Sequence, residues 1–333
     1  MASRSGLSGF VRVCSGLLIA STLLFGCSPE ENVEPSASET NPNQSEPTRT
    51  NPNKEPSLDN MVYIEGGTFM MGSDANRPDE LPIHEVTLDG FWMDKYEVTN
   101  ADFAKFVEET GHVTTAEQYG NSILFIGSDG PVDLRDVGQW WSVVDGVDWR
   151  HPEGPGSNID SRMDHPVVHV SWNDAKAYAE WAGKSLPTEA QFEYAAKLGT
   201  TDDPKTPEAN IFQGTFPYDN NVTDGFEATA PVGSFPPNSL GMYDLAGNVW
   251  EWCLDWYRYD AYLTSEEKNP SGPSTSYDPE DPRLWKRVTR GGSYLCHESY
   301  CSGYLPTTRM KTPPDDSHSN TGFRCVVNGA RPE

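Results

Sequence analysis

The sequence predicts an α+β fold that is irregular and rich in loops, with little regular secondary structure. Its 333 residues include 29 glycines and 27 prolines, a composition that interrupts long helices and strands. Only three segments show a helical spacing of apolar residues, and all three precede Gly199. Beyond Gly199 the strand candidates are short and separated by Gly, Pro, Asp and Asn, and no repeat of roughly 20–50 residues occurs.

The folded part of the chain opens with segments that alternate like strands. Residues 61–72 contain two apolar runs on either side of a Gly-Gly turn, and residues 84–99 alternate in the same way. We therefore expect short strands at the start of the domain.

Three helices are expected after these strands, and each is followed by a glycine. They cover residues 101–110 after Asn100, residues 174–182 after Asn173, and residues 189–198 after Thr188. The last begins with a capping box, in which Thr188 and the residue three positions later, Gln191, cap one another. The side chains expected to face the core are Phe103, Phe106, Val107, Ala175, Tyr178 and Trp181.

Composition divides the chain into three segments. Residues 1–26 are an expected lipoprotein signal peptide, residues 27–58 a tether and residues 59–330 a folded domain. The tether is rich in Pro, Asn, Ser and Glu and has almost no apolar side chains. We expect it to be disordered, because burial of its side chains cannot offset the entropy lost on ordering.

The first segment has the pattern of an export signal. Arg4 and Arg12 are its only charges, and they precede an apolar run over residues 16–25 that is too short to span a membrane. The run ends in Leu-Phe-Gly-Cys27, which resembles a bacterial lipobox with Cys27 as the lipidated residue. We therefore expect an exported protein that is lipid-anchored to a bacterial membrane and faces the periplasm or the cell surface. Ordinary signal-peptide cleavage is the alternative.

The chain is strongly acidic. It has 24 Lys and Arg against 50 Asp and Glu, which gives a formal net charge of −26. This charge argues against nucleic acid as a partner, because phosphate binding requires clustered Lys and Arg. The charge is compatible with calcium binding and with export. We also expect the protein to be a monomer.

Four cysteines lie in the folded domain, and their spacing has two interpretations. An exported chain can keep disulfides, which would pair Cys296 with Cys301 and Cys253 with Cys325. Alternatively, the two thiolates of Cys296 and Cys301 suit Cu(I), whereas structural zinc requires two further ligands. Spacing alone leaves both interpretations open.

Two oxygen-rich regions are candidate calcium sites. Residues 244–252 combine Asp, Gly and Asn in a tight run, and Asn210 and Asp224 supply similar groups around residues 220–226. Carboxylate, amide and backbone oxygens are the ligands that calcium prefers. Capped turns without a metal are the alternative for both regions.

Six segments spread over Met61–Val327 together resemble the formylglycine-generating enzymes, also called sulfatase-modifying factors. The resemblance implies the loop-rich fold of that family, which belongs to the C-type-lectin-like superfamily. Several of the segments recur across the superfamily, so they indicate fold and not function. The segments are Gly66-Gly-Thr-Phe-Met-Met-Gly72, Met93-Asp-Lys-Tyr-Glu-Val-Thr-Asn100, Trp149-Arg-His-Pro-Glu-Gly-Pro155, His165-Pro-Val-Val-His-Val-Ser-Trp-Asn173, Trp181-Ala-Gly-Lys-Ser-Leu-Pro-Thr-Glu-Ala190 and Gly247-Asn-Val-Trp-Glu-Trp252.

A seventh segment carries the functional part of the resemblance. Arg290-Gly-Gly-Ser-Tyr-Leu-Cys-His-Glu-Ser-Tyr-Cys301 is similar to the active-site loop of formylglycine-generating enzymes, whereas the family's non-catalytic paralogue lacks the cysteine pair. The resemblance implies a copper-dependent oxidoreductase with Cu(I) between Cys296 and Cys301. Its expected reaction uses O2 to convert the Cys of a Cys-x-Pro-x-Arg motif in unfolded sulfatases to Cα-formylglycine.

The resemblance also implies roles for further residues. Ser293 and Trp250 would join the cysteines at the catalytic centre, Ser293 at the O2 pocket or the substrate and Trp250 in the pocket wall. The positions that match the substrate groove or active site are Tyr300, Arg309, Ser317 and Asn320.

Two structural calcium sites carry over from the family. The first set is Asn210, Ile211, Asp224 and Phe226, in which Ile211 and Phe226 offer backbone carbonyls. The second set is Asp244, Leu245, Gly247 and Val249.

The chain also departs from the family at a cysteine. Some relatives carry a Cys, paired with the equivalent of Cys325, where this chain has Ala179. Cys325 is therefore either free or bonded to Cys253.

Two other functions are compatible with the sequence. A catalytically idle, surface-anchored ligand-binding module of the same fold is one, and the cysteine pair argues against it. A non-haem iron sulfoxide synthase is the other. That chemistry requires a His-rich iron triad, and none of the 7 histidines lies in an H-x-x-x-H-x-E pattern.

Overall fold

The computed structural model describes residues 54–331, except residue 76 and residues 200–207. The expected signal peptide, the lipidation site Cys27 and most of the tether therefore lie outside the described residues. All described residues belong to one compact unit, Glu46–Glu333. Within this part of the chain, no helix combines the length and apolar character needed to cross a membrane.

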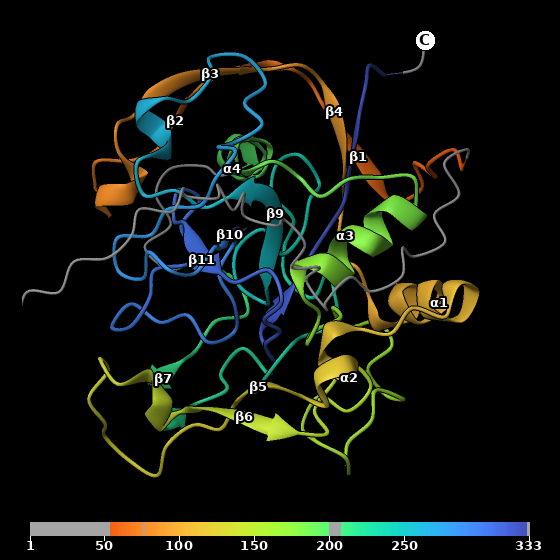
Figure 1. Cartoon of the computed structure of the whole chain (residues 1–333), viewed down its shortest axis with the longest axis vertical. Coiled ribbons are helices and arrows are strands. Elements are labelled where there is room, and N and C mark those ends of the chain that lie inside the picture. The colour runs from red at the N-terminus through yellow and green to blue at the C-terminus, as the bar shows by residue number, and fades with distance from the viewer. Residues whose placement is uncertain (1–53, 76, 200–207, 332–333) are drawn as a thin grey trace, which may run out of the picture. The chain divides into compact units, whose positions relative to one another are not determined.

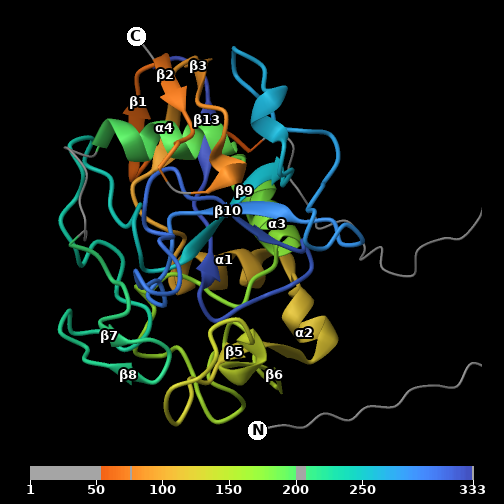
Figure 2. The same cartoon turned by 90° about the vertical axis from the view of Figure 1, so that its left-hand side faces the viewer.

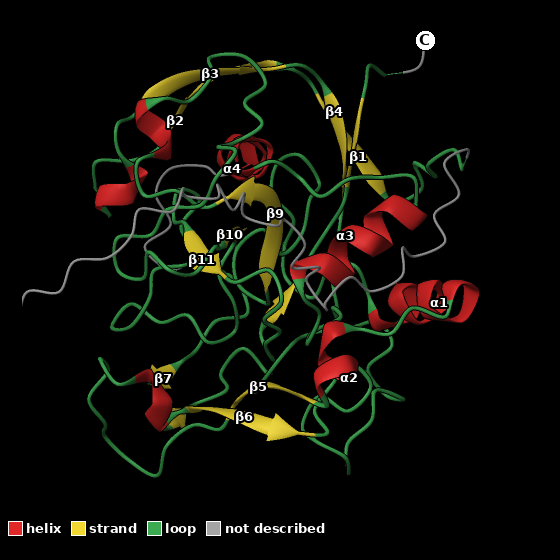
Figure 3. Ribbon diagram, viewed as in Figure 1, coloured by secondary structure: helices red, strands yellow, loops and turns green. Residues whose placement is uncertain are grey.

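Loops make up most of the described chain, and the helices and strands are short (Figure 3). This confirms the predicted α+β class with little regular secondary structure. The α-helices are α1 (Asn100–Thr110), α2 (Thr115–Tyr119), α3 (Trp172–Trp181) and α4 (Glu189–Gly199). Short 3-10 helices cover Pro78–Glu80, Val137–Gln139 and Ala261–Leu263.

The strands form two small sheets and three two-stranded ladders. The three-stranded sheet has the order β1 (Met61–Ile64), β4 (Phe91–Asp94), β13 (Val326–Asn328). The four-stranded sheet has the order β11 (Met310–Thr312), β10 (Arg287–Arg290), β9 (Trp250–Trp256), β12 (Thr321–Gly322). The ladders pair β2 (Gly67–Met71) with β3 (His84–Leu88), β5 (Asn121–Phe125) with β6 (Trp141–Asp145), and β7 (Gly214–Thr215) with β8 (Asp219–Asn220).

The four-stranded sheet lies between the two ends of this unit. Strands β1–β4 lie at one end and the β5–β6 and β7–β8 ladders at the other, with α4, β9 and β10 between them (Figures 1 and 2). The first four strands confirm the strands predicted within residues 61–72 and 84–99, although the strands of the second region end at Asp94. Strand β10 packs against α4 and leads directly into the segment that carries Cys296 and Cys301. The layer formed by α4, β9 and β10 therefore positions the candidate site.

Two of the predicted helix caps are displaced. The N-cap of α1 is Thr99, not Asn100, and the N-cap of α3 is Ser171, not Asn173. The hydroxyl of each cap residue accepts a hydrogen bond from the backbone N–H of an aspartate three residues later, Asp102 in α1 and Asp174 in α3. The carboxylate of that aspartate accepts a hydrogen bond from the backbone N–H of the cap residue. Because of this reciprocal bonding, each helix begins earlier than predicted. The Thr188–Gln191 box of α4 is confirmed by hydrogen bonds of 3.0 and 3.2 Å. Helix α2, which has a box of its own, was not predicted.

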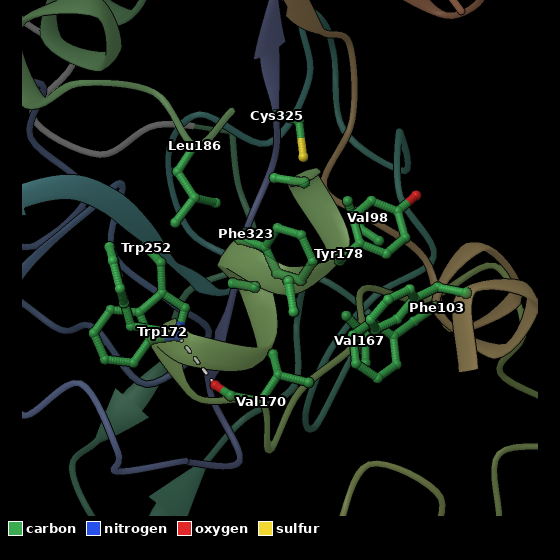
Figure 4. Packing of buried hydrophobic residues seen from close by; sticks show 14 of the residues in the cluster. Val98, Phe103, Val167, Val170, Trp172, Tyr178, Leu186, Trp252, Phe323 and Cys325 are labelled. Atoms are coloured by element: carbon green, nitrogen blue, oxygen red, sulfur yellow. Dashed lines mark hydrogen bonds between the residues drawn. The ribbon is translucent and has the colours of Figure 1, made fainter. Parts of the chain in front are cut away.

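The main core lies between α1, α3 and the C-terminal segment (Figure 4). Phe323 meets the rings of Tyr178 and Phe103 at centroid distances of 5.2 and 6.5 Å, and the indole of Trp252 donates to the carbonyl of Val170 at 3.0 Å. The predicted inward residues Phe103, Phe106, Ala175, Tyr178 and Trp181 are buried, and Val107 packs at the edge of this core.

Cys253 and Cys325 are free thiols, so the pairing considered for them is wrong. They are buried in different places. Cys325 belongs to the core of α1 and α3, beside Tyr178 and Phe323 (Figure 4), whereas Cys253 packs with Phe192 and Tyr257. Each therefore acts as a small apolar side chain in its own cluster.

The described end of the expected tether, residues 54–58, meets the domain. The ammonium group of Lys54 lies 3.7 Å from the centroid of the Trp181 ring, a cation–π contact. Gly183 lies so close to this segment that a Cβ there would be 2.5 Å from the Lys54 carbonyl oxygen. Contacts with the domain thus begin before residue 59.

Candidate active site

The cysteine loop, residues 291–309, connects β10 to β11 and begins with two glycines whose conformation shapes it. Gly291 and Gly292 have φ values of +90° and +79°, a region that other residues rarely adopt. A Cβ on Gly292 would lie 2.6 Å from the backbone nitrogen of Tyr304. The start of the loop therefore folds closely onto its middle, and both cysteines turn inward.

The two cysteines of this loop meet in a buried apolar pocket. Cys296 is 0% and Cys301 8% exposed, and their sulfur atoms lie 2.7 Å apart in hydrogen-bond contact. Ala209, Ile211, Trp250 and Tyr304 pack around them. Both are free thiols, so of the two interpretations of their spacing the structure has the reduced pair.

The two thiols differ in acidity. Burial raises the pKa of Cys296 well above its usual value. The hydrogen bond with Cys296 lowers the pKa of Cys301. Cys301 is therefore the more acidic thiol of the pair.

Trp250 forms one wall of the pocket that holds the two cysteines. It lies on β9 and is buried with the cysteines. A Cβ on Gly303 would lie 2.4 Å from the Trp250 ring and 2.7 Å from the sulfur of Cys296. The backbone of Gly303 is thus wedged between the indole and the thiol, and only glycine fits there.

Ser293 and Asn320 form a polar pair beside the thiols. The amide of Asn320 donates to the hydroxyl of Ser293 at 3.0 Å, and both residues are buried. The carbonyl of Ser293 accepts from the backbone N–H of Cys296 at 2.9 Å, and that of Asn320 accepts from Trp250 at 2.8 Å. The structure therefore brings together four of the predicted residues, Ser293, Trp250, Cys296 and Asn320.

Tyr300 lies at the edge of the cysteine pocket. Its ring stacks on Phe216 with centroids 4.3 Å apart and an interplanar angle of 9°, and Trp140 meets it edge-on at 5.7 Å. Trp140 was not predicted, because the adjacent pair Trp140 and Trp141 matches no motif that assigns a role to either residue. The aromatic groups limit access of water to this side of the loop.

Ser317 lies in a separate buried cluster. Its hydroxyl is 2.7 Å from that of Ser122, which in turn is 2.8 Å from Nδ1 of His169. The other ring nitrogen of His169 donates to the carbonyl of Pro152 at 3.0 Å. Sequence patterns missed Ser122 and His169, because they are 47 residues apart in the chain and meet only in the fold.

Arg309, expected at the substrate groove or the active site, is buried in the structure. It is 1% exposed, and its guanidinium donates to both carboxylate oxygens of Glu189, at 2.6 and 3.0 Å, and to the carbonyl of Asp79 at 2.7 Å. The group is therefore occupied by internal partners. Glu189, to which the sequence analysis assigned no role in the site, is its main anchor.

The family model for a sulfatase-modifying factor enzyme 1-like domain matches residues 46–329. The chain belongs to this family. The formylglycine-generating enzyme of Mus musculus is 47% identical over 290 residues, which cover 81% of this chain and 76% of that protein. The inactive C-alpha-formylglycine-generating enzyme 2 of the same organism is 38% identical over 290 residues, which cover 82% of this chain and 87% of that protein.

A solved structure supports the same fold. PvdO from Pseudomonas aeruginosa superposes with a TM-score of 0.53 at 26% sequence identity, over 80% of this chain and 93% of that one. The expected fold of the sulfatase-modifying family is thus confirmed.

The first predicted calcium set of this family member contains two oxygen atoms without partners. Oδ1 of Asn210 and Oδ2 of Asp224 are buried and accept no hydrogen bond from the described residues. Such atoms are costly unless a water or a cation satisfies them. The set therefore fits a hard cation, to which Ile211 and Phe226 would add backbone carbonyls.

The second predicted calcium set is more fully occupied by protein groups. Oδ2 of Asp244 accepts from the backbone N–H of Gly233 at 2.7 Å, and burial raises the pKa of Asp244. The backbone carbonyl of Asp244 accepts from Arg324 at 3.3 Å. One buried carboxylate and the carbonyls of Leu245, Gly247 and Val249 make up the donor set.

Side-chain clusters that would bind other metals are absent from the described part of the chain. No group of three or more His, Cys, Asp or Glu that could hold a metal ion occurs there. A cavity of about 1050 Å³ is lined by Phe125, Trp149, Phe212, Tyr294 and Ser319 among others, and neither cysteine lines it.

We predict that protonation of His169 destabilises the fold in acid. Burial lowers the pKa of His169 from 6.5 to about 4, so the unfolded chain binds this proton more readily than the folded one. The contribution of neutral His169 to the free energy of unfolding is fully present above pH 6.5 and is lost as the pH falls toward 4. The variant His169→Asn tolerates the residue's φ of +58° and does not titrate.

The measurement is the free energy of unfolding by urea between pH 7.5 and 4 for both proteins. The advantage of the wild type over His169→Asn should shrink by up to about 3 kcal/mol as the pH falls. Parallel pH profiles would show that His169 does not carry this effect.

Proposed function

We propose that this protein is a copper-dependent oxidase that converts the Cys of a Cys-x-Pro-x-Arg motif in unfolded sulfatases to Cα-formylglycine, using O2. One observation carries the proposal: two buried free thiols, Cys296 and Cys301, in contact at 2.7 Å. The family membership and the names of the relatives support the same substrate class.

The residues of the pocket fit this chemistry. Cys296 and Cys301 would hold Cu(I), which prefers soft thiolate ligands and, when bound, supplies the activation of O2. Cys301 is the more acidic of the two thiols, and both would lose their protons on metal binding. Trp250 excludes water from the thiols, and the Ser293–Asn320 pair presents polar groups to a substrate or to O2.

The two alternative functions have less support. An idle ligand-binding module would not require two reduced thiols in a buried pocket, although an inactive relative exists at 38% identity. A sulfoxide synthase would require an iron site, and the described residues hold no cluster of His, Cys, Asp and Glu suited to one.

We predict that Cys301→Ser abolishes both copper retention and turnover, because one thiolate cannot hold Cu(I) against solvent. Turnover is measured by mass spectrometry of a Cys-x-Pro-x-Arg peptide, and copper by anaerobic titration. Cys253→Ser is the matched control: it also removes a buried free thiol but lies in another cluster, and it should retain copper and rate. Normal copper binding and rate in Cys301→Ser would refute the assignment.

We also propose that calcium binds the two oxygen-rich sets and stabilises the fold without taking part in the chemistry. The partnerless oxygens of Asn210 and Asp224 support the first site. A ligand that binds only the folded state stabilises it by mass action, by about 2.7 kcal/mol at a hundredfold excess over its Kd.

Calcium removal is therefore predicted to lower the melting temperature, and calcium but not copper should restore it. Asp224→Asn should weaken this response, whereas Asp219→Asn, at an exposed position nearby, should leave it intact. An unchanged melting temperature after chelation of a calcium-loaded sample would contradict the proposal.

We propose further that the protein is exported as a monomer, is anchored to a bacterial membrane by a lipid on Cys27 and acts there on sulfatases before they fold. The charge and hydropathy pattern of residues 1–26 and the tether composition support this. An enzyme held near the export site would meet substrate chains at a raised local concentration.

We predict that Cys27→Ala moves the protein from the membrane fraction to the soluble fraction, because the acyl anchor is lost. Cys14→Ala, which changes a cysteine within the signal peptide, is the control and should remain in the membrane fraction. A Cys27→Ala protein that stays membrane-bound with unchanged sulfatase processing would overturn the proposed anchor.

A further inference from the structure

We propose that Glu189, at the first turn of α4, is a positioning residue that holds both ends of the cysteine loop and thereby sets the geometry of the thiol pair. The inference rests on the proposed copper function for its effect on metal binding, but the mechanical part concerns the loop alone. Glu189 does not touch the thiols, so it acts through the two arginines that flank the loop.

One carboxylate joins the residue that precedes the loop to the last residue of the loop. Oε1 of Glu189 accepts from Nη1 of Arg290 at 2.9 Å and from Nε of Arg309 at 2.6 Å. Oε2 accepts from Nη2 of Arg309 at 3.0 Å. Arg290 directly precedes Gly291 and Arg309 is the last loop residue, so a single side chain fixes the distance between the two ends.

Two further contacts of α4 and the loop reinforce this arrangement. Oε2 of Glu193 accepts from Nη2 of Arg290 at 2.7 Å, and the same nitrogen donates to the loop carbonyl of Pro306 at 2.7 Å. The ring of Phe192 packs so close to Gly291 that a Cβ there would lie 3.1 Å from it. One face of α4 thus contacts the loop at its start and near its end.

Burial makes these ion pairs strong constraints. The side chains of Arg290 and Arg309 are 0% exposed and that of Glu189 is 4% exposed. Burial alone would raise the pKa of Glu189, but the two guanidinium groups lower it below its usual value, so the carboxylate stays charged. The fork of Arg309 holds both oxygens at once, which fixes orientation as well as distance.

The loop needs such an external anchor because it has little structure of its own. Between β10 and β11 it contains turns and no strand or helix. Its sulfurs nevertheless meet at 2.7 Å, and a two-thiolate metal site depends on their separation. Because no helix or strand lies within the loop, a displacement of either end would also displace Cys296 or Cys301.

The test compares Glu189→Gln with Asp174→Asn. Asp174 is an equally buried carboxylate that caps α3 and accepts from Thr115 and His112, outside the loop, so its loss controls for reduced stability. Cu(I) affinity is measured anaerobically by competition with a chromophoric chelator, and hydrogen exchange is measured for the amides of residues 291–309. Both are recorded at a temperature where each variant is folded.

Glu189→Gln should lower Cu(I) affinity at least about tenfold and speed exchange throughout the loop. The kcat should fall while the KM for the peptide stays within about twofold, because the clamp acts on the thiols. Asp174→Asn should leave loop exchange and copper affinity unchanged. Arg309→Lys, which keeps the charge but loses the fork, should show the same changes as Glu189→Gln to a smaller degree, and provides the test if Glu189→Gln does not fold.

The inference would be overturned if Glu189→Gln kept a Cu(I) affinity within twofold of the wild type and wild-type hydrogen exchange in the loop. It would also be overturned if Asp174→Asn changed Cu(I) affinity and loop exchange as much as Glu189→Gln does. Failure of the proposed function looks different. If the wild type itself does not bind Cu(I), the copper proposal fails, whereas faster loop exchange in Glu189→Gln alone would still establish the clamp.

Discussion

The buried ion pairs between α4 and the two arginines that flank the cysteine loop are the constraint on which the rest of the site depends. Taking a carboxylate and two guanidinium groups out of water is costly, and removing one partner of such a set costs about 3–5 kcal/mol, because a charge is left uncompensated. Glu189 and Arg309 are 120 residues apart in sequence, so their contact also ties the last part of the domain to its middle.

The oxygen-rich segments are connected to the same loop through the backbone. The N–H of Gly247 donates to the carbonyl of Gly291 at 2.8 Å, and that of Tyr294 donates to the carbonyl of Asn248 at 2.9 Å. Asn248 in turn donates from its backbone to Asn210 at 2.9 Å. A cation at Asn210 and Asp224 would therefore stabilise a segment that is hydrogen-bonded to the start of the cysteine loop, which would link structural calcium to the thiols.

Local patterns predicted what depends on neighbouring residues in sequence. The strands before residue 99, the capping box at Thr188 and the inward side chains of α1 and α3 follow from periodicity and hydroxyl placement. The cap at Ser171 was missed because Asn173, two residues on, is also a good capping residue. The cysteine pair was found, but its reduced state was not fixed by spacing. The roles of Glu189, Ser122 and His169 escaped prediction, since their partners are distant in the chain. The family resemblance placed Arg309 at the substrate groove or the active site and gave no information on its carboxylate partner.

The central claim is that Cys296 and Cys301 form a two-thiolate copper site, and copper K-edge X-ray absorption of the anaerobic, Cu(I)-loaded protein tests it most directly. The account predicts a spectrum of low-coordinate Cu(I) with two sulfur ligands and no nitrogen or oxygen in the first shell. A spectrum dominated by nitrogen or oxygen ligands, or a protein that retains no copper under these conditions, would contradict it.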